Sequence, residues 1–295
     1  MTGKARRYTG ISIGPEKFHR GQIKFYVILL PFVGFMLLPF MYIFFHALKS
    51  TSELFAFPPK FITLRPTADN FRALFRMMSS SNIPAARYLF NNLVVTLAVM
   101  GFSIVFSVMA AYALSKKKFR GREAVFTVNQ VALMFVPTAV TIPRFLIVAK
   151  LGLIDTYWAH ILPTIAMPVG LFLLKQFMDQ LPDALVEAAQ IDGAGDLTII
   201  RRIIVPMVRP AIATIGILSF QLAWGNVETS SIYINDETLR TFAFYIGNIS
   251  NASGNVVAGQ GMSAAAALIM FVPNLLIFIL MQSKMLNTMA YSGIK

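Results

Sequence analysis

Long apolar stretches separated by short polar segments dominate this chain. Six of them are long enough to cross a hydrocarbon core of about 30 Å as helices, since a helix rises about 1.5 Å per residue. The pattern therefore predicts an all-α membrane protein with six transmembrane helices. The first stretch should remain uncleaved, because its apolar run is too long for a signal peptide and no small-residue cleavage site follows it. The predicted spans lie near residues 25–48, 93–114, 124–149, 157–174, 211–227 and 263–281.

Composition supports a membrane protein and excludes several other classes. Only 13% of the residues are charged, and the mean hydropathy is +0.65. Soluble domains contain about 25% charged residues. The chain has no cysteine, and His19, His46 and His160 are far apart in the sequence. We therefore expect no disulfide and no metal site.

Basic residues predict the orientation of the spans. Lys and Arg crowd residues 4–24 and the connection at 116–122, where the positive-inside rule places them in the cytoplasm. This rule explains the net charge of +13 without a nucleic-acid partner. We predict a cytoplasmic N-terminal tail (residues 1–24), a six-helix domain (25–282) and a cytoplasmic C-terminal tail (283–295), with both termini inside.

The polar connection at residues 179–209 predicts two short helices. The first would run from Pro182 to Ala189, and glycines at 193 and 195 would allow a sharp turn. Asp196 is a plausible N-cap for the second helix, which Pro206 should end. Its apolar residues, at three- and four-residue spacing, predict one face that packs beneath the bundle. By periodicity alone, an amphipathic hairpin lying at the headgroups remains an alternative. The residues of the apolar face are Leu197, Ile200, Ile203 and Ile204.

A motif inside this connection points to a function. The residues read EAAQIDGAGDLTIIRRIIVP from Glu187 to Pro206. This run resembles the EAA loop of bacterial ABC importers, whose pattern is E-A-A, three residues, Gly, nine residues and then I-x-L-P. Val205 stands where leucine is usual, and Asp-Gly-Ala at 192–194 is typical of the sugar branch. The resemblance assigns contact with an ATPase subunit to Glu187, Ala188, Ala189, Asp192, Gly193, Ala194, Ile203 and Pro206.

The resemblance implies a type I ABC importer permease fold in which residues 179–209 form the cytoplasmic coupling loop. In that family the loop docks in a cleft of the ATP-binding subunit, and its glutamate, here Glu187, pairs with a basic residue there. Gly193 would be the hinge of the docking element. The chain lacks G-x-x-x-x-G-K-[ST], so it is not an ATPase by itself. ATP and Mg would be bound by the partner subunits.

The layout of almost the whole chain is similar to the second, maltose-type permease subunit of carbohydrate ABC importers. The shared features are six spans, a long first external loop with Pro58-Pro59, the run 110–118 closing the second span, and a short C-terminal tail. The resemblance implies a bacterial inner membrane, a homologous permease subunit as heterodimer partner, two ATP-binding subunits and an extracytoplasmic solute-binding protein. Residues 228–262 would reach toward that binding protein, or form a flexible external connection.

The substrate would be an oligosaccharide. Arg144, Lys150 and Arg240 on the predicted external side favour an acidic one, and the chain resembles permeases for uronate oligosaccharides such as alginate. A neutral malto-type oligosaccharide is the alternative. Polar residues inside the spans are candidates for the translocation pathway, although they could equally make hydrogen bonds between helices. These candidates are Asn129, Gln130, Gln221, Trp224, Asn226 and Asn274.

Two other classes of protein compete with the importer. An ion-driven secondary transporter usually has ionisable residues at mid-membrane and often inverted repeats. Asp and Glu are absent from the middle of every predicted span, and no internal repeat is evident. A membrane scaffold with no transport role is not excluded by composition. Co-purification of an ATPase would distinguish the importer from both.

Overall fold

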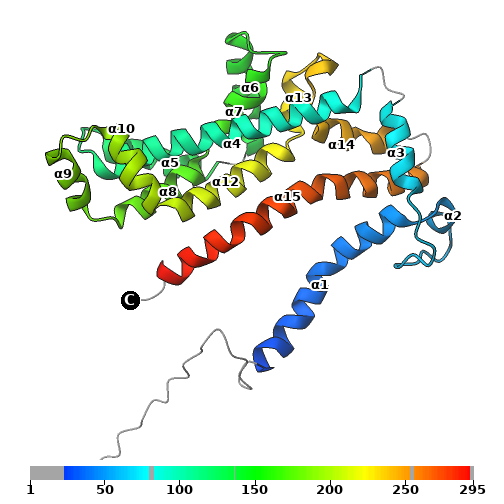
Figure 1. Ribbon diagram of the computed structural model, residues 1–295. Helices are drawn as coiled ribbons and strands as arrows, with labels where there is room; N and C mark the ends of the chain where they lie inside the picture. Colours follow the sequence, from blue (N-terminus) through cyan, green and yellow to red (C-terminus); the bar gives the residue numbers. More distant parts are fainter. Residues whose placement is uncertain (1–22, 80–82, 136, 253–255, 293–295) are drawn as a thin grey trace, which may run out of the picture.

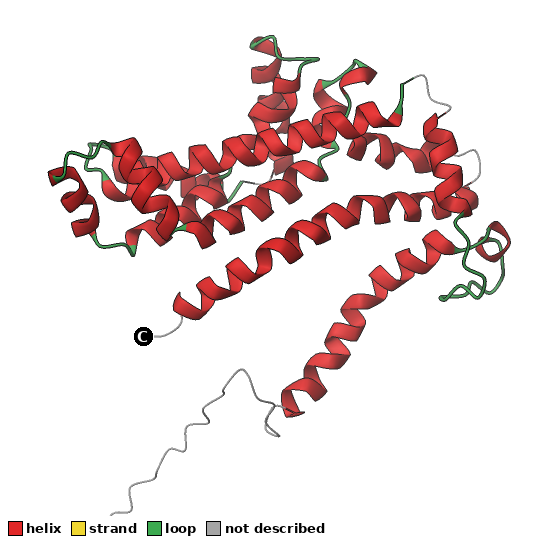
Figure 2. Cartoon of the chain, in the orientation of Figure 1, coloured by secondary structure: helices red, strands yellow, loops and turns green. Residues whose placement is uncertain are grey.

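The computed structural model describes residues 23–79, 83–135, 137–252 and 256–292. These residues form helices and loops, and none of them lies in a β-strand (Figure 2). The predicted N-terminal tail at 1–24 falls almost entirely outside the described residues. The helices of three or more residues are α1 (Ile23–Leu48), α2 (Thr51–Leu54), α3 (Asp69–Ser79), α4 (Ala85–Lys116), α5 (Arg122–Ala132), η2 (Pro137–Val140), α6 (Thr141–Lys150), α7 (Tyr157–Ile165), α8 (Pro168–Asp179), α9 (Asp183–Ile191), α10 (Asp196–Ile199), the π turn η3 (Ile200–Ile204), α11 (Val205–Met207), α12 (Arg209–Trp224), α13 (Glu228–Tyr233), η4 (Glu237–Leu239), α14 (Phe242–Ala252) and α15 (Val256–Ser292).

The long helix α4 is the axis on which the bundle is built. It has 32 residues and no proline, so it spans about 48 Å. Helices α7, α8, α12 and α14 pack along it, with α9 and α10 at its C-terminal end and α13 and α14 toward its N-terminal end (Figure 1). Its buried face alternates small, polar and apolar side chains, which allows neighbouring helices to approach closely.

Helices α1 and α15 form a second arm beneath this bundle (Figure 1). Helix α1 is apolar all round, and none of its best spanning window is buried within the chain. Such a helix is suited to lipid or to another subunit. It is fixed at its C-terminal end, where the Nδ2 of buried Asn70 on α3 donates to the carbonyls of Ala47 at 2.9 Å and Lys49 at 2.8 Å. These bonds satisfy carbonyls that the helix end leaves without partners.

Three described helices are long and apolar enough to cross a membrane, and up to five spans result if each bent pair counts as one. The three are α1, α4 and the segment Gly259–Gln282 of α15. The predicted fourth span is α7 followed by α8, bent by 44° where Pro168 begins the second helix. The run Asp196–Met207 meets α12 at 86°, so the predicted fifth span begins at that corner. The predicted third span, 124–149, is two helices, α5 and α6, separated by residues 133–140.

The structure also differs from the predicted connections. Helix α15 continues to Ser292, so most of the predicted tail at 283–295 is helical and only its last three residues lie outside the described part. The segment 228–262, read as a loop, contains α13, η4, α14 and the start of α15. Its Asn, Ser and Gly content suggested a loop, yet buried contacts of Tyr233, Phe242 and Ala243 outweigh that local preference.

Candidate coupling site at the C-terminal end of α4

Helix α9 carries the predicted docking residues and ends in a Schellman motif. Gly193 adopts φ +80°, which only glycine reaches without strain. The amide of Ala194 donates to the carbonyl of Ala189 at 2.9 Å. The amide of Gly193 donates to the carbonyl of Gln190 at 3.0 Å. These are the two bonds that define the motif. The spacing from Ala189 to Gly193 thus has a structural cause, because the glycine must stand directly after the helix cap.

The two alanines that bracket this motif attach α9 to the bundle. Ala189 and Ala194 are partly buried against a core that includes Val186, Ile199 and Ile204. A hydrophobic contact at these two positions commonly accompanies a Schellman motif. Glu187, Ala188 and Asp192 lie on the exposed side. The motif therefore divides α9 into one small-residue face that packs on the core and one face with the Glu187 carboxylate in the open.

The second helix of the loop begins one residue earlier than predicted. Gly195, with extended backbone, is the N-cap, and Asp196 is the first helical residue instead of the cap. The carboxylate of Asp196 bonds to other elements and makes no capping bond to its own helix. The N-cap prediction for Asp196 was wrong, because its Oδ1 bonds to Lys117 and Tyr112 on α4 and not to its own helix.

The apolar face of this helix is confirmed in part. Ile204 is buried, and Ile200 and Ile203 pack partly against the same core. Leu197 is 73% exposed, while Ile199, which the spacing did not select, is fully buried. The π turn at 200–204 shifts the register of the helix and explains part of this difference.

Pro206 does not end the helix as predicted. It stands at the start of α11, directly after the π turn, and the chain bends only after Met207. In a regular helix the proline ring clashes with the carbonyl four residues earlier. The wider π turn, closed by the bond from the Val205 amide to the Ile200 carbonyl, accommodates the ring.

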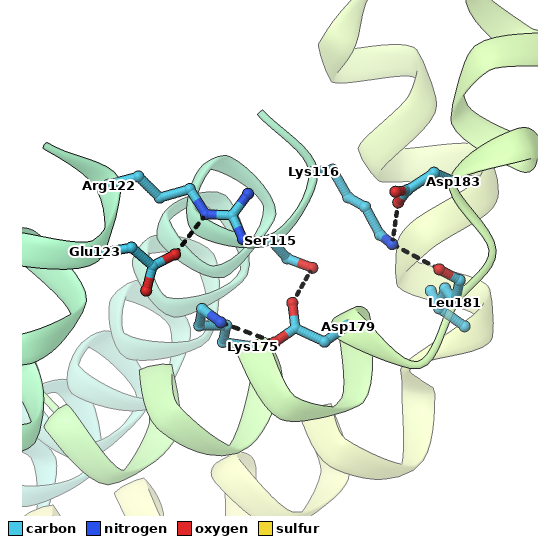
Figure 3. A network of polar contacts seen from close by, with 8 residues as sticks. All are labelled: Ser115, Lys116, Arg122, Glu123, Lys175, Asp179, Leu181 and Asp183. Carbon is cyan, nitrogen blue, oxygen red and sulfur yellow. Dashed lines mark hydrogen bonds and ion pairs between the residues drawn. The ribbon is translucent and has the colours of Figure 1, made fainter. Parts of the chain in front are cut away.

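Two consecutive lysines at the end of α4 hold the two helices of the loop. The Nζ of Lys116 donates to Oδ1 of Asp183 at 2.7 Å and to the carbonyl of Leu181 at 2.6 Å (Figure 3). The Nζ of Lys117 lies 2.5 Å from Oδ1 of Asp196. Each aspartate is the first residue of its helix. Anions at helix N-termini and cations at a helix C-terminus are both favoured by the helix dipole.

These two attachments differ in their environment. The Lys116 side chain is only 2% exposed, whereas that of Asp183 is 73% exposed. The ammonium of Lys116 is therefore desolvated and needs both acceptors, and its hydrogen bond lowers the pKa of Asp183. The hydrogen bond to Asp196 raises the pKa of Lys117. Tyr112, one helical turn back on α4, also donates to Asp196 at 3.1 Å.

A third contact joins α8 to the same end of α4. The Oγ of Ser115 donates to Oδ1 of Asp179 at 2.7 Å, and the Nζ of Lys175 donates to Oδ2 at 2.8 Å (Figure 3). The ammonium of Lys175 also lies 4.3 Å from the ring centroid of Phe126 on α5. Asp179 and Asp183 thus anchor α8 and α9 to α4.

The predicted pathway residues divide into two groups. Asn129, Trp224 and Asn226 have partners within the chain. Asn129 donates to the Pro168 carbonyl at 3.1 Å, and Trp224, which is 4% exposed, donates to the Met270 carbonyl at 3.0 Å. Asn226 accepts from the amide of Thr229 at 2.9 Å. These are the helix-to-helix and turn contacts that were the alternative to a pathway role, and the buried indole of Trp224 offers no open face to a sugar ring in this conformation.

The other pathway candidates keep free hydrogen-bonding capacity. Gln130 and Gln221 are exposed. The Oδ1 of Asn274 is buried and has no hydrogen-bond partner among the described residues. Gln130 and Gln221 are open to a second subunit or a substrate, whereas Asn274 could bond to one only after its Oδ1 is uncovered.

Sequence reasoning missed the lysines as functional residues. The run 116–118 was used to orient the spans and, within 110–118, to compare the layout with the maltose-type permease, and neither use pointed to the partners of its lysines. It also missed Asn91, which is fully buried on α4. A buried amide needs partners, but the sequence does not say which ones.

Comparison with known proteins identifies the family. Residues 103–283 match the family model described as binding-protein-dependent transport system inner membrane component. The chain is 34% identical over 211 residues (72% of this chain, 71% of the relative) to the polygalacturonan/rhamnogalacturonan transport system permease protein YtcP of Bacillus subtilis. It is 29% identical to the trehalose transport system permease protein SugB of Mycobacterium tuberculosis, over 89% of this chain and 94% of the relative.

A solved structure shows the same fold. It is the crystal structure of a bacterial ABC transporter involved in the import of the acidic polysaccharide alginate, with a TM-score of 0.75 at 20% identity, covering 90% of this chain and 98% of that one. The likeness establishes the type I permease fold. This chain belongs to the binding-protein-dependent transport system inner membrane components and is a permease subunit of a sugar ABC importer.

Proposed function

We propose that this chain forms half of the translocation pathway of an oligosaccharide importer and that α9 docks into an ATPase subunit. The observation that supports this most directly is the placement of Glu187. Its carboxylate is exposed on a helix whose opposite face, end and start are fixed by the core, by the Schellman motif and by Lys116. A carboxylate held in this way can pair with a basic residue of a partner without first ordering its own backbone, which lowers the entropic cost of docking.

The membrane topology belongs to the same proposal. The basic end of α4 and the loop at 179–209 lie together, and the positive-inside rule favours the cytoplasm for both. The broken pair α5 and α6 would cross the bacterial inner membrane as the third of six spans. Both termini would lie on its cytoplasmic side. The break in the α-helix between α5 and α6 is tolerated inside a membrane where protein or a water-filled pathway surrounds it. The predicted partners are a homologous permease, two ATPase subunits that bind ATP and Mg, and an extracytoplasmic binding protein.

We propose an acidic oligosaccharide as the substrate, with a neutral one as the alternative. The relative YtcP is named for polygalacturonan and rhamnogalacturonan, and the solved transporter imports alginate. A second solved alginate transporter, with a TM-score of 0.56 at 19% identity, is in complex with a periplasmic protein that holds an alginate pentasaccharide. The relative SugB is named for trehalose, which is neutral, so the neutral class retains support. Gln130, Gln221 and Asn274 are the side chains we expect to face the pathway.

The test is co-purification of the ATPase subunit with a Glu187→Ala variant. The matched control is Glu123→Ala, because the Glu123 side chain is 78% exposed on the cytoplasmic side of α5 and lies outside the loop. We expect the Glu187 variant to insert normally and to lose at least tenfold in ATPase affinity, since a desolvated interfacial charge contributes about 2–5 kcal/mol. Unchanged co-purification in both variants would contradict the docking assignment.

The substrate class needs a separate measurement. The complete complex in liposomes should hydrolyse ATP faster when its binding protein carries oligogalacturonate or oligoalginate than when it carries trehalose or a malto-oligosaccharide. Stimulation by the neutral sugars alone would reverse the substrate proposal while leaving the importer assignment intact.

A further inference from the structure

Helix α4 has a polar network at each end. At the cytoplasmic end, Lys116 and Lys117 hold the two helices of the coupling loop. At the other end, Asn91 donates through Nδ2 to the carbonyls of Thr238 at 2.8 Å and Arg240 at 2.9 Å. Its Oδ1 accepts from the hydroxyl of Tyr157 at 2.6 Å. Asn91 is fully buried, and its side-chain amide makes these three hydrogen bonds to residues that are far away in the sequence.

Two further residues of α4 reach the same external segment, residues 238–243. The Nε of Arg87 donates to the Thr238 carbonyl at 3.1 Å. Asn92 accepts from the Ala243 amide at 3.4 Å and donates to the Trp224 carbonyl at 3.3 Å. Three side chains within one and a half turns of α4 therefore hold the backbone that links η4 to α14. Helix α4 therefore contacts both the coupling loop and this segment through side chains. Helix α12 also joins them, since the chain continues from the loop through α12 to Asn226, whose carbonyl accepts from the hydroxyl of Thr241 at 3.5 Å.

The helix between these networks is built to keep its shape. It contains no proline, whereas α1 contains Pro31 and Pro39 and α15 contains Pro273. About 30 residues, or about 45 Å, separate Arg87 from Lys117. Proline is a main cause of kinks in helices, and α4 is one uninterrupted α-helix without it. A displacement of one end can thus reach the other along a continuous helix.

We propose that α4 is the connector through which the external segment 238–243 and the coupling loop move together, with Asn91, Lys116 and Lys117 as its positioning residues. The inference rests on the proposed function for the meaning of the coupling loop. It adds that the loop is moved by a helix that ends 67 residues before Asp183, the first residue of α9, through ion pairs that are not part of the EAA motif. Substrate would signal across the membrane by shifting the external end of α4.

The first measurement uses the purified full chain and needs no ATPase. Hydrogen exchange of residues 183–199 is compared in the unaltered chain, in Asn91→Leu and in the milder Arg87→Ala, which removes one exposed hydrogen bond. The control is Arg72→Ala, an exposed arginine whose partner Asp69 lies in its own helix. We expect faster exchange at 183–199 in both α4 variants and not in the control. Faster exchange at 238–243 with no change at 183–199 would show that the two ends are independent and would overturn the proposal.

The second measurement uses the complete complex and a charge swap. Lys117→Glu and Asp196→Lys should each lower the stimulation of ATP hydrolysis by loaded binding protein about fivefold. The double swap should recover part of it, because the pair is restored while both charges then oppose the helix dipoles. The stimulation is expressed relative to the basal hydrolysis and the ATPase co-purification of each variant, so that weaker docking is separated from weaker coupling. Combined with Arg87→Ala, the Lys117→Glu effect should be less than additive, since either change already disconnects the ends.

The two proposals fail differently. If no ATPase co-purifies with the unaltered chain but exchange at 183–199 follows the α4 variants, the docking assignment is wrong and the connector stands. If Glu187→Ala weakens ATPase binding while the charge swap gives no rescue and exchange is unchanged, the docking assignment stands and the connector is wrong.

Discussion

Substitution of Gly261 by alanine should loosen the attachment of α1 to the rest of the chain. A Cβ at Gly261 would lie 2.5 Å from Oδ1 of Asn70, 2.8 Å from its Cγ and 2.8 Å from Cδ1 of Leu54. Leu54 can move, because the contact is at the end of a flexible side chain. Asn70 is 6% exposed, and its Nδ2 holds the carbonyls of Ala47 and Lys49. The clash therefore falls on the residue that closes the C-terminal end of α1.

The size of the effect follows from these distances. Ordinary contact requires a shift of Asn70 by roughly 0.8 Å, which stretches its hydrogen bonds toward the limit of about 3.5 Å. Overpacking costs about 1–3 kcal/mol, and carbonyls left unpaired add about 1–3 kcal/mol. Alanine is favoured over glycine in a helix by about 1 kcal/mol, which offsets part of this cost. The free energy of unfolding should fall by about 2–4 kcal/mol, or the melting temperature by roughly 5–10 °C.

The assay is thermal unfolding of the purified chain in detergent, followed by circular dichroism. Gly101→Ala on α4 is the matched control, since a Cβ there meets nothing within 4 Å and should stabilise or leave the midpoint unchanged. In an Asn70→Ala background the obstacle is gone, so Gly261→Ala should then cost less than about 1 kcal/mol. Equal losses in both backgrounds would refute the reasoning, and so would a Gly261→Ala variant as stable as the control.

Three further substitutions or conditions test other parts of the structure. Gly193→Ala should cost about 1–2 kcal/mol through its left-handed backbone alone and should weaken ATPase co-purification. Gly195→Ala, with φ −71°, should cost only the smaller loss of a glycine N-cap and should leave co-purification unchanged. His160→Leu should destabilise residues 237–241 by about 2–4 kcal/mol, measured as faster hydrogen exchange. The reason is that His160 is 1% exposed and its Nε2 donates to the Leu239 carbonyl at 3.1 Å. His160→Gln should recover part of the loss. Exchange in the coupling loop, corrected for its intrinsic pH dependence, should be constant from about pH 5 to about pH 9. The lowered pKa of Asp183 keeps its ion pair until the pH falls through that lowered value, and the raised pKa of Lys117 keeps its pair until the pH rises through that raised value; a change in loop exchange near neutral pH would contradict this.

Local pattern was sufficient to predict much of the fold. The predicted span 93–114 lies inside α4, and the predicted helix at 182–189 corresponds to α9, because apolar run length and turn residues are local properties. A sharp turn at glycines 193 and 195 was likewise expected, and Gly193 makes it with a positive φ whereas Gly195 has φ −71°. Local pattern failed where the chain breaks inside an apolar run. Residues 124–149 are apolar enough to span, yet they form two helices, and nothing in their periodicity distinguishes the two cases.

The sequence predicted the docking residues of the candidate site, but it did not predict the ion pairs that hold those residues in place. Glu187 and Gly193 stand at fixed spacing within one short segment, so their relation can be read from the sequence. Lys116 and Asp183 are 67 residues apart and meet only because α8 returns along α4. A lysine at the end of a membrane helix is expected at the headgroups whether or not it has a partner. Long-range pairing of this kind depends on how the helices pack in the bundle. This pairing fixes the polar connection to α4, the longest of the described helices without a proline.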